Sequence, residues 1–172
     1  MEHLQYPIGK FEYGKRYTLA EIRENITYLK AFPPILVKKV AHAPDELLDT
    51  PYRPKGWTVR QVVHHLVDSH IHAYIRSKLL LTEENPTINP YQEPIWAEME
   101  DAKHLPVSVS LQILEGLHLR WTLALENVPD ADFSRTYTHP QYGHIFELGE
   151  VMALYAWHCK HHLAHISLVL AD

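Results

Sequence analysis

The chain of 172 residues has the length of one typical domain, so we expect residues 1–172 to form a single globular domain. Hydrophobic residues make up 46% of the chain and charged residues 22%, which excludes a disordered or fibrous protein. The 21 acidic residues outnumber the 16 basic ones and no basic block stands out, which argues against a nucleic-acid partner.

Cysteine content and apolar runs indicate the cellular setting. The single cysteine, Cys159, excludes an internal disulfide, and the sequence after Met1 lacks the basic-then-apolar order of a signal peptide. No uncharged apolar run approaches the roughly 18 residues that a membrane-spanning helix needs. The sequence therefore predicts a cytoplasmic protein with no membrane partner.

The first predicted helix begins after Thr18. Apolar residues recur at helical spacing in TLAEIRENITYLK, and Glu21 stands three residues after Thr18, as in a capping box. The pair Pro33-Pro34 is expected to break or kink this helix, because proline cannot donate to the helical hydrogen bonds; helix then resumes to about residue 43. Residues 44–56, with three prolines and Gly56, are expected to form a loop.

The second predicted helix runs from Trp57 to about Thr82. This stretch contains no glycine or proline, its apolar residues gather on one side, and Thr58 can cap its start. Residues 83–106 contain four prolines, too many for one regular element. A long ordered connection of this kind is often functional.

Two further helices are predicted in the second half. They cover Ser108 to Glu126 and about Leu148 to Leu170, and β-forming residues on both sides of Pro140 to Gly143 suggest a small hairpin within 134–147. Four amphipathic segments with few strand signals predict an all-α fold, a four-helix bundle with long connections and a small β-hairpin. The long second connection allows a topology other than simple up-and-down.

Histidine is unusually abundant, at 14 residues, and eight of these fall in two clusters on the second and fourth predicted helices. Residues i and i+4 share a helix face, so both His158 with His162 and His161 with His165 could converge on one cation. His162 borders the apolar stripe of its helix and His158 lies next to it, whereas His161 is far outside. Periodicity therefore selects His158 and His162 as the inward pair.

On the second helix the choice of a metal-binding histidine stays open. His64 lies opposite the apolar stripe, His65 on its flank and His70 well inside it, where a packed core histidine is expected. Asp68 shares the flank of His65 and could accept the second ring N–H of a metal-bound imidazole, as carboxylates commonly do.

Several other residues could contact a substrate or could have only a structural role. Tyr91 and Trp96, in the long connection, can contact a substrate or simply pack against the bundle, and Arg120 or Arg76 can bind a substrate carboxylate or form a surface ion pair. Cys159 points away from His158 and is expected to be a small buried residue. The remaining histidines are expected at the surface or in packing, although His139 and His144 flank the hairpin tip and could reach the mouth of a site.

Four segments in order resemble a known family over about residues 7–170. GWTVRQVVHHLVDSH (56–70) is similar to the DinB-like motif W-x7-H-L-x-D, and three further segments resemble the YfiT-like branch of metal-dependent hydrolases and bacillithiol S-transferases. These are LTEENPTINPYQEPIWAEM (81–99), LEGLHLRW (114–121) and YAWHCKHHLAHI (155–166).

The resemblance implies a four-helix bundle, often a homodimer, in which three histidines hold one divalent metal ion per chain. The ligands of the motif fall on His65, His158 and His162. Three neutral imidazoles leave a fourth position open, as in catalytic zinc sites. Zinc is the first choice of metal and nickel the second.

The open position allows two reactions. A metal-bound water would hydrolyse a small substrate, whereas a metal-bound thiolate would transfer a low-molecular-weight thiol, such as a bacillithiol-like one, to a small electrophile. The resemblance slightly favours thiol transfer. A non-catalytic metal-binding dimer is the alternative from another class, and a fourth protein ligand, Asp68 or His72, would favour it.

Overall fold

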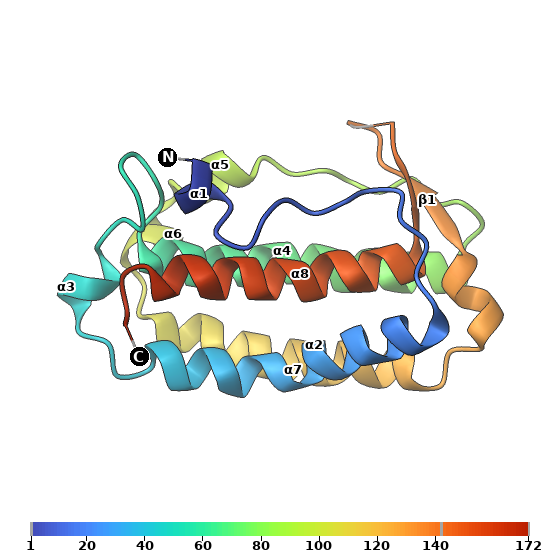
Figure 1. Cartoon of the computed structure of the whole chain (residues 1–172), viewed down its shortest axis with the longest axis horizontal. Coiled ribbons are helices and arrows are strands. Elements are labelled where there is room, and N and C mark those ends of the chain that lie inside the picture. Colours follow the sequence, from blue (N-terminus) through green and yellow to red (C-terminus); the bar gives the residue numbers. More distant parts are fainter. Residues whose placement is uncertain (1, 142, 172) are drawn as a thin grey trace.

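A computed structural model describes residues 2–141 and 143–171. Four long helices dominate it: α2 (Leu19–Val40), α4 (Val59–Thr82), α7 (Val107–Glu126) and α8 (Leu148–Ser167). Each long helix packs against two others, α2 and α4 both lying between α7 and α8 (Figure 1). The described residues thus form the expected four-helix bundle, and none of their helices is long and apolar enough to cross a membrane.

Short elements fill the connections. They are α1 (Glu2–Gln5), α3 (Asp45–Leu48), α5 (Glu93–Trp96), α6 (Glu100–His104), the 3-10 helix η1 (Asp130–Ser134) and the strands β1 (Thr136–Thr138) and β2 (Ile145–Glu147). The strands pair antiparallel with Tyr137 opposite Phe146, which confirms the predicted hairpin. Tyr142, in the sequence between the two strands, lies outside the described residues.

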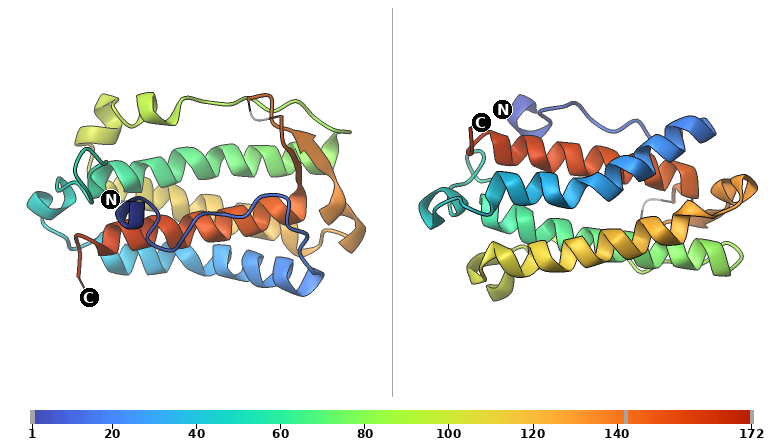
Figure 2. Two further views of the ribbon diagram at one scale, coloured as in Figure 1. Left: turned by 45° about the horizontal axis from the view of Figure 1, so that its top comes forward. Right: turned by 90° about the horizontal axis from the view of Figure 1, so that it is seen from below.

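The connection of residues 83–106 determines the topology. It returns along the bundle and brings the chain back to the end where α4 began, so that α7 runs in the same direction as α4 (Figures 1 and 2). An up-and-down bundle would make these consecutive helices antiparallel. Thr87 in this connection also bridges to Thr138 of β1, which joins the connection to the hairpin.

The capping residues act as expected. Thr18 and Thr58 each form a capping box, the first with Glu21 and the second with Gln61, so α2 and α4 begin where their sequences predict. Of the break or kink predicted at Pro33-Pro34, the break is wrong, because α2 is one continuous helix through both prolines. Pro33 removes the donor that Leu29 O would otherwise have in the helix, and His118 Nδ1 lies 2.6 Å from that oxygen in its place.

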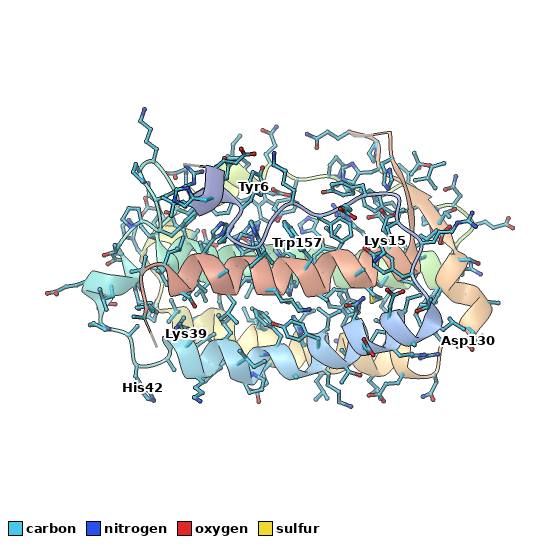
Figure 3. The ribbon with its side chains drawn as sticks, viewed as in Figure 1. Tyr6, Lys15, Lys39, His42, Asp130 and Trp157 are labelled. Atoms are coloured by element: carbon cyan, nitrogen blue, oxygen red, sulfur yellow. The ribbon has the colours of Figure 1, made fainter. Side chains whose placement is uncertain are left out.

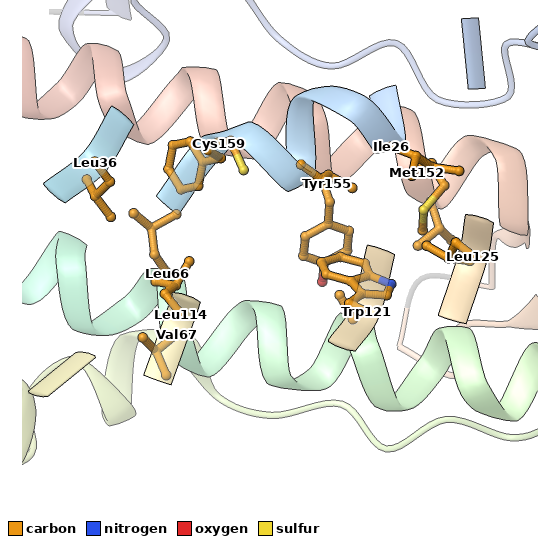
Figure 4. Close-up of a cluster of buried hydrophobic side chains, with 14 of the residues drawn as sticks. Ile26, Leu36, Leu66, Val67, Leu114, Trp121, Leu125, Met152, Tyr155 and Cys159 are labelled. Atoms are coloured by element: carbon orange, nitrogen blue, oxygen red, sulfur yellow. The ribbon is translucent and has the colours of Figure 1, made fainter. Parts of the chain in front are cut away.

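The apolar core lies between the four helices. Leu66, Leu114, Trp121 and Met152 have no exposed surface, and Figure 4 shows them spread along the space between the helices. Cys159 is also fully buried among them, as expected for a small apolar residue. This core holds α4 and α8 side by side.

An N-terminal segment, residues 6–17, runs along the outer face of α8 (Figures 1 and 3). The buried carboxylate of Glu150 on α8 accepts a hydrogen bond from the Gly14 N–H at 2.6 Å. Tyr6 and Trp157 both stack on His161, with ring centroids 6.0 and 4.4 Å away. His161, expected far from the apolar face, is therefore buried beneath this segment.

Candidate metal centre

Three histidines from two helices converge in the structure. His65 on α4 and His158 and His162 on α8 each offer one ring nitrogen, and these nitrogens lie within 4.8 Å of one another. His65 Nε2 and His158 Nε2 are 3.3 Å apart. In the part of the chain that the structure describes, no fourth histidine, cysteine or carboxylate joins the group. The donor set fits a divalent ion with an open coordination position.

Helix geometry places these rings and excludes their neighbours. His158 and His162 are one turn apart, and their ring centroids are 4.4 Å apart. His64 turns away from them: its Nδ1 lies 2.7 Å from Ser110 Oγ and its Nε2 3.0 Å from Leu105 O. On α4 it is therefore His65, and not His64, that the structure brings to the cluster.

Burial keeps the three imidazoles neutral. Loss of solvent lowers the pKa of His65 to about 3, and it lowers the pKa values of His158 and His162 well below their usual range. Neighbouring histidines add to this effect, since a second positive charge nearby would be unfavourable. Neutral imidazole is the form that binds metals, so the site does not need to lose protons at pH 7.

The outer partners of the ligands are histidines. His158 Nδ1 lies 3.1 Å from His70 Nε2, and His162 Nδ1 lies 3.3 Å from His165 Nδ1. The ring of His65 instead lies against the indole of Trp57, with centroids 4.8 Å apart. All the partners of His158 and His162 are therefore uncharged groups.

Asp68 does not take the role expected for it. Among the described hydrogen bonds none joins its carboxylate to His65, His158 or His162, and its backbone carbonyl lies 2.8 Å from His72 Nδ1. Burial, with a smaller contribution from Asp101, raises the pKa of Asp68 to about 6. The structure therefore shows no hydrogen bond by which the Asp68 carboxylate orients a ligand histidine among the described residues.

A cavity of about 520 Å³ opens onto the three histidines, within the usual size range of ligand pockets. Polar side chains line much of it. Those from α4, α8, the long connection and the hairpin include Ser69, Arg76, Tyr91, Glu93, Tyr137, His139 and Tyr155. Arg53 and Lys55, from the loop before α4, also line it.

The three residues expected to contact substrate have different positions. Tyr91 lines the cavity and stacks on His72, with ring centroids 4.1 Å apart. Trp96 packs behind Tyr91 at 4.8 Å and is not part of the lining. Arg120 lies on α7 over the ring of Tyr74, at 5.7 Å, and the structure does not bring it to the cavity.

Sequence reasoning missed several lining residues. Ser69 follows His65 by one helical turn and Tyr155 precedes His158 by almost one, so helical spacing from the ligands could have found both. Tyr137 and Arg53 come from the hairpin and a loop, and no local pattern relates them to the cluster. His139 lines the cavity, as its place near the hairpin tip allowed.

Comparisons with known proteins agree with this geometry. A family model described as the DinB superfamily matches residues 29–166. A protein from Oceanobacillus iheyensis named "putative metal-dependent hydrolase" is 48% identical over 163 residues, which cover 95% of this chain and 94% of that protein. One of the same name from Bacillus cereus is 50% identical over 167 residues, covering 97% and 95%.

Solved structures extend the comparison. YfiT from Bacillus subtilis, described as "a probable metal-dependent hydrolase with an unusual four-helix bundle topology", is 45% identical with a TM-score of 0.93, and the match covers 96% of this chain and 94% of that one. A mycothiol-dependent maleylpyruvate isomerase is similar in fold alone, at 13% identity with a TM-score of 0.66, covering 88% and 62%.

Proposed function

Because the chain belongs to the DinB superfamily, we propose that it is a metal-dependent enzyme whose His65, His158 and His162 hold one divalent ion, zinc or nickel. The convergence of three neutral imidazoles at the wall of a cavity carries this proposal. When bound, the ion supplies Lewis-acid chemistry, lowering the pKa of a thiol or water at its open position. A fully enclosed ion with four protein ligands would instead be structural.

Of the two reactions, the cavity favours transfer of a low-molecular-weight thiol to a small electrophile. Three cationic side chains line it, Arg53, Lys55 and Arg76, against one described carboxylate, Glu93. This lining suits an anionic thiol such as a bacillithiol-like coenzyme. Hydrolysis, which the names of the relatives favour, is the second candidate, but among the described residues no carboxylate joins the three-histidine group, where it could act as a general base for water.

Arg76 is the residue that we propose for a carboxylate of the substrate, in place of Arg120. Its Nε is buried without a hydrogen-bond partner among the described residues, and Nη2 donates to Asn89 O at 3.3 Å. Arg76 follows His65 by about three turns of α4, or about 16 Å along the helix axis. An extended thiol could therefore reach the histidine cluster while its carboxylate contacts Arg76.

The test uses matched thiols on the protein loaded with Co²⁺, whose visible spectrum reports thiolate binding. ω-Mercaptoalkanoates of increasing length are compared with ω-mercaptoalcohols on the wild type and on Arg76→Gln. We expect the carboxylates to bind about 10-fold more tightly than the alcohols, and this preference to disappear in the variant. Arg120→Gln is the control and should keep it. Equal binding of both series refutes the role of Arg76 but not thiol binding.

Turnover distinguishes thiol transfer from hydrolysis. Mass spectrometry of a reaction that contains thiol, electrophile and zinc-loaded protein should show the adduct forming faster than with His158→Ala or metal-free protein. If the rates are equal and the loaded protein hydrolyses an ester or amide, the hydrolase alternative is correct. If the loaded protein does neither, the non-catalytic alternative replaces both.

We also propose that the protein forms a homodimer in its cytoplasmic setting. The outer face of α7 exposes a stripe of apolar side chains, among them Leu119 and Leu123, which are 61% and 59% exposed. A second copy would cover this stripe. Light scattering of the wild type should give twice the chain mass, and Leu119→Glu should give a monomer; a monomeric wild type refutes the dimer.

A further inference from the structure

The two metal-ligand candidates on α8, His158 and His162, each begin a chain of hydrogen bonds that ends on a backbone carbonyl. The first chain is longer, since it passes through two buried histidines, His70 and His118, to Leu29 O. The second passes through His165 to Gln5 O. A carbonyl oxygen only accepts hydrogen bonds, so each chain has a fixed direction.

In the first hydrogen-bond chain, the carbonyl of Leu29 on α2 fixes which ring nitrogens donate and which accept. Leu29 O has lost its helical donor because the residue four positions later is Pro33, and His118 Nδ1, at 2.6 Å, must carry the proton that replaces it. His118 is only 1% exposed and has no carboxylate partner among the residues that the structure describes, so it stays neutral and its Nε2 is an acceptor. His70 Nδ1 donates to it at 2.7 Å.

The same reasoning carries the chain to the cluster. His70 is fully buried and neutral, so once its Nδ1 donates, its Nε2 accepts. The partner of that Nε2 at 3.1 Å is His158 Nδ1, which must therefore carry the proton of His158. His158 Nε2 keeps its lone pair and faces the cluster, where the His65 Nε2 at 3.3 Å donates to it in the absence of metal.

The second chain gives the same result for His162. His165 Nε2 lies 3.1 Å from Gln5 O in α1 and must donate to it, so the Nδ1 of the neutral His165 accepts. That Nδ1 is 3.3 Å from His162 Nδ1, which then carries the proton. The His162 Nε2 lone pair is left for the cluster, and stacking on Tyr52, at 4.0 Å, holds the His165 ring in place.

We propose that His70, His118 and His165 are positioning residues of the metal centre, which hold His158 and His162 as Nδ1–H tautomers with both Nε2 lone pairs directed at the ion. This role rests on the metal site of the proposed function. Metal-binding histidines usually donate their second N–H to a carboxylate, a carbonyl or water, which fixes the tautomer and the ring orientation. Here neutral imidazoles take that place, so the tautomers are fixed without a buried negative charge beside the ion.

The direct test is the tautomer itself, measured on the metal-free wild type. Long-range ¹H–¹⁵N correlation spectra of protein labelled at histidine nitrogens distinguish protonated from bare ring nitrogens, and His158→Phe and His162→Phe assign the signals. We expect the proton of both ligands on Nδ1. A proton on the Nε2 of either ligand overturns the proposal for that chain. This measurement needs no bound metal, so it stands even if the proposed function fails.

The second test is metal affinity in a matched pair of variants. His70→Phe removes the acceptor for His158, whereas His64→Phe removes a buried histidine of the same helix whose two hydrogen bonds do not lead to the cluster. Competition with a chelator should show Zn²⁺ affinity about 10- to 100-fold lower in His70→Phe and in His165→Phe. His64→Phe should stay near the wild type.

The two tests separate positioning from general destabilisation. In folded His70→Phe the His158 proton should be found partly on Nε2, which simple loosening of the core would not produce selectively. Equal Zn²⁺ affinities in His70→Phe and His64→Phe overturn the proposal. If His70→Phe does not fold, the tautomers of the wild type decide alone.

Discussion

Lowering the pH from 7 to 5 should destabilise the metal-free protein, because its buried histidines take up protons only on unfolding. Burial lowers the pKa of His118 to about 4 and that of His65 to about 3, from a usual value of 6.5. Below pH 6.5 the unfolded chain therefore binds more protons than the folded one. The stability that these groups contribute is complete above pH 6.5 and is lost as the pH falls toward their folded pKa values.

The size of the effect follows from these pKa values. At pH 5 each of His118 and His65 favours the unfolded chain by about 2 kcal/mol, since one pKa unit is worth about 1.4 kcal/mol. Asp68 acts oppositely, because its pKa is raised to about 6 and it gains a proton in the folded protein. This proton uptake stabilises the folded protein at pH 5 by at most about 1 kcal/mol, and solvent screening reduces that contribution. The net loss is about 3 kcal/mol, and the lowered pKa values of His70, His158 and His162 add to it.

Urea unfolding in the presence of a chelator, followed by circular dichroism, measures this loss at pH 7 and pH 5. A loss of about 3 kcal/mol is a large part of the 5–15 kcal/mol typical of a domain. The control is His118→Phe, whose stability should change about 2 kcal/mol less between the two pH values, whatever its absolute stability. A wild-type change below about 1 kcal/mol would refute the view that these imidazoles are buried and neutral.

Three further perturbations test the fold around the site. Chelation should lower the Tm of the metal-loaded protein and leave its helical circular dichroism at room temperature unchanged, because the apolar core lies between the helices; loss of helix would make the metal structural. Gly149→Ala should destabilise by about 1–3 kcal/mol in urea, since the new Cβ would lie 2.6 Å from Ile22 Cδ1, whereas Gly116→Ala, with nothing within 4 Å, should not destabilise. Glu150→Leu should speed proteolysis between residues 6 and 17, because Gly14 loses its acceptor; an unchanged cleavage rate would contradict that anchoring.

The features that the sequence predicted correctly are local ones. The capping boxes at Thr18 and Thr58 lie within four residues of sequence, and the apolar periodicity of each helix repeats every turn. His158 and His162 lie on the same face of α8 because of helical spacing alone, and the structure brings them together as expected. Periodicity alone did not show whether His65 is the metal-binding histidine of α4. His65 lies on the flank of the apolar stripe, and whether that flank faces the cluster depends on how α4 packs against the other helices.

The features that the sequence did not predict depend on contacts between distant segments. The pair Pro33-Pro34 was expected to break or kink α2, but the helix is continuous, and His118, on another helix, supplies a donor for Leu29 O. Asp68 was chosen as the partner of a ligand because carboxylates are common in that role, whereas His70 performs it for His158. A proline within an amphipathic helix leaves a carbonyl that needs a donor, and that signal could have suggested one of the many histidines.

The two hydrogen-bond chains of neutral histidines also explain how so many histidines can be buried in one bundle. A buried polar group is costly unless it is hydrogen-bonded, and in each chain every ring nitrogen between the ligand and the carbonyl has a partner. A carboxylate in the place of His70 would leave a buried charge whenever the metal was absent, at a cost of several kcal/mol. With neutral partners, the same hydrogen bonds satisfy the buried nitrogens and orient His158 and His162. The stability of the metal-free fold and the geometry of the metal site therefore do not oppose each other.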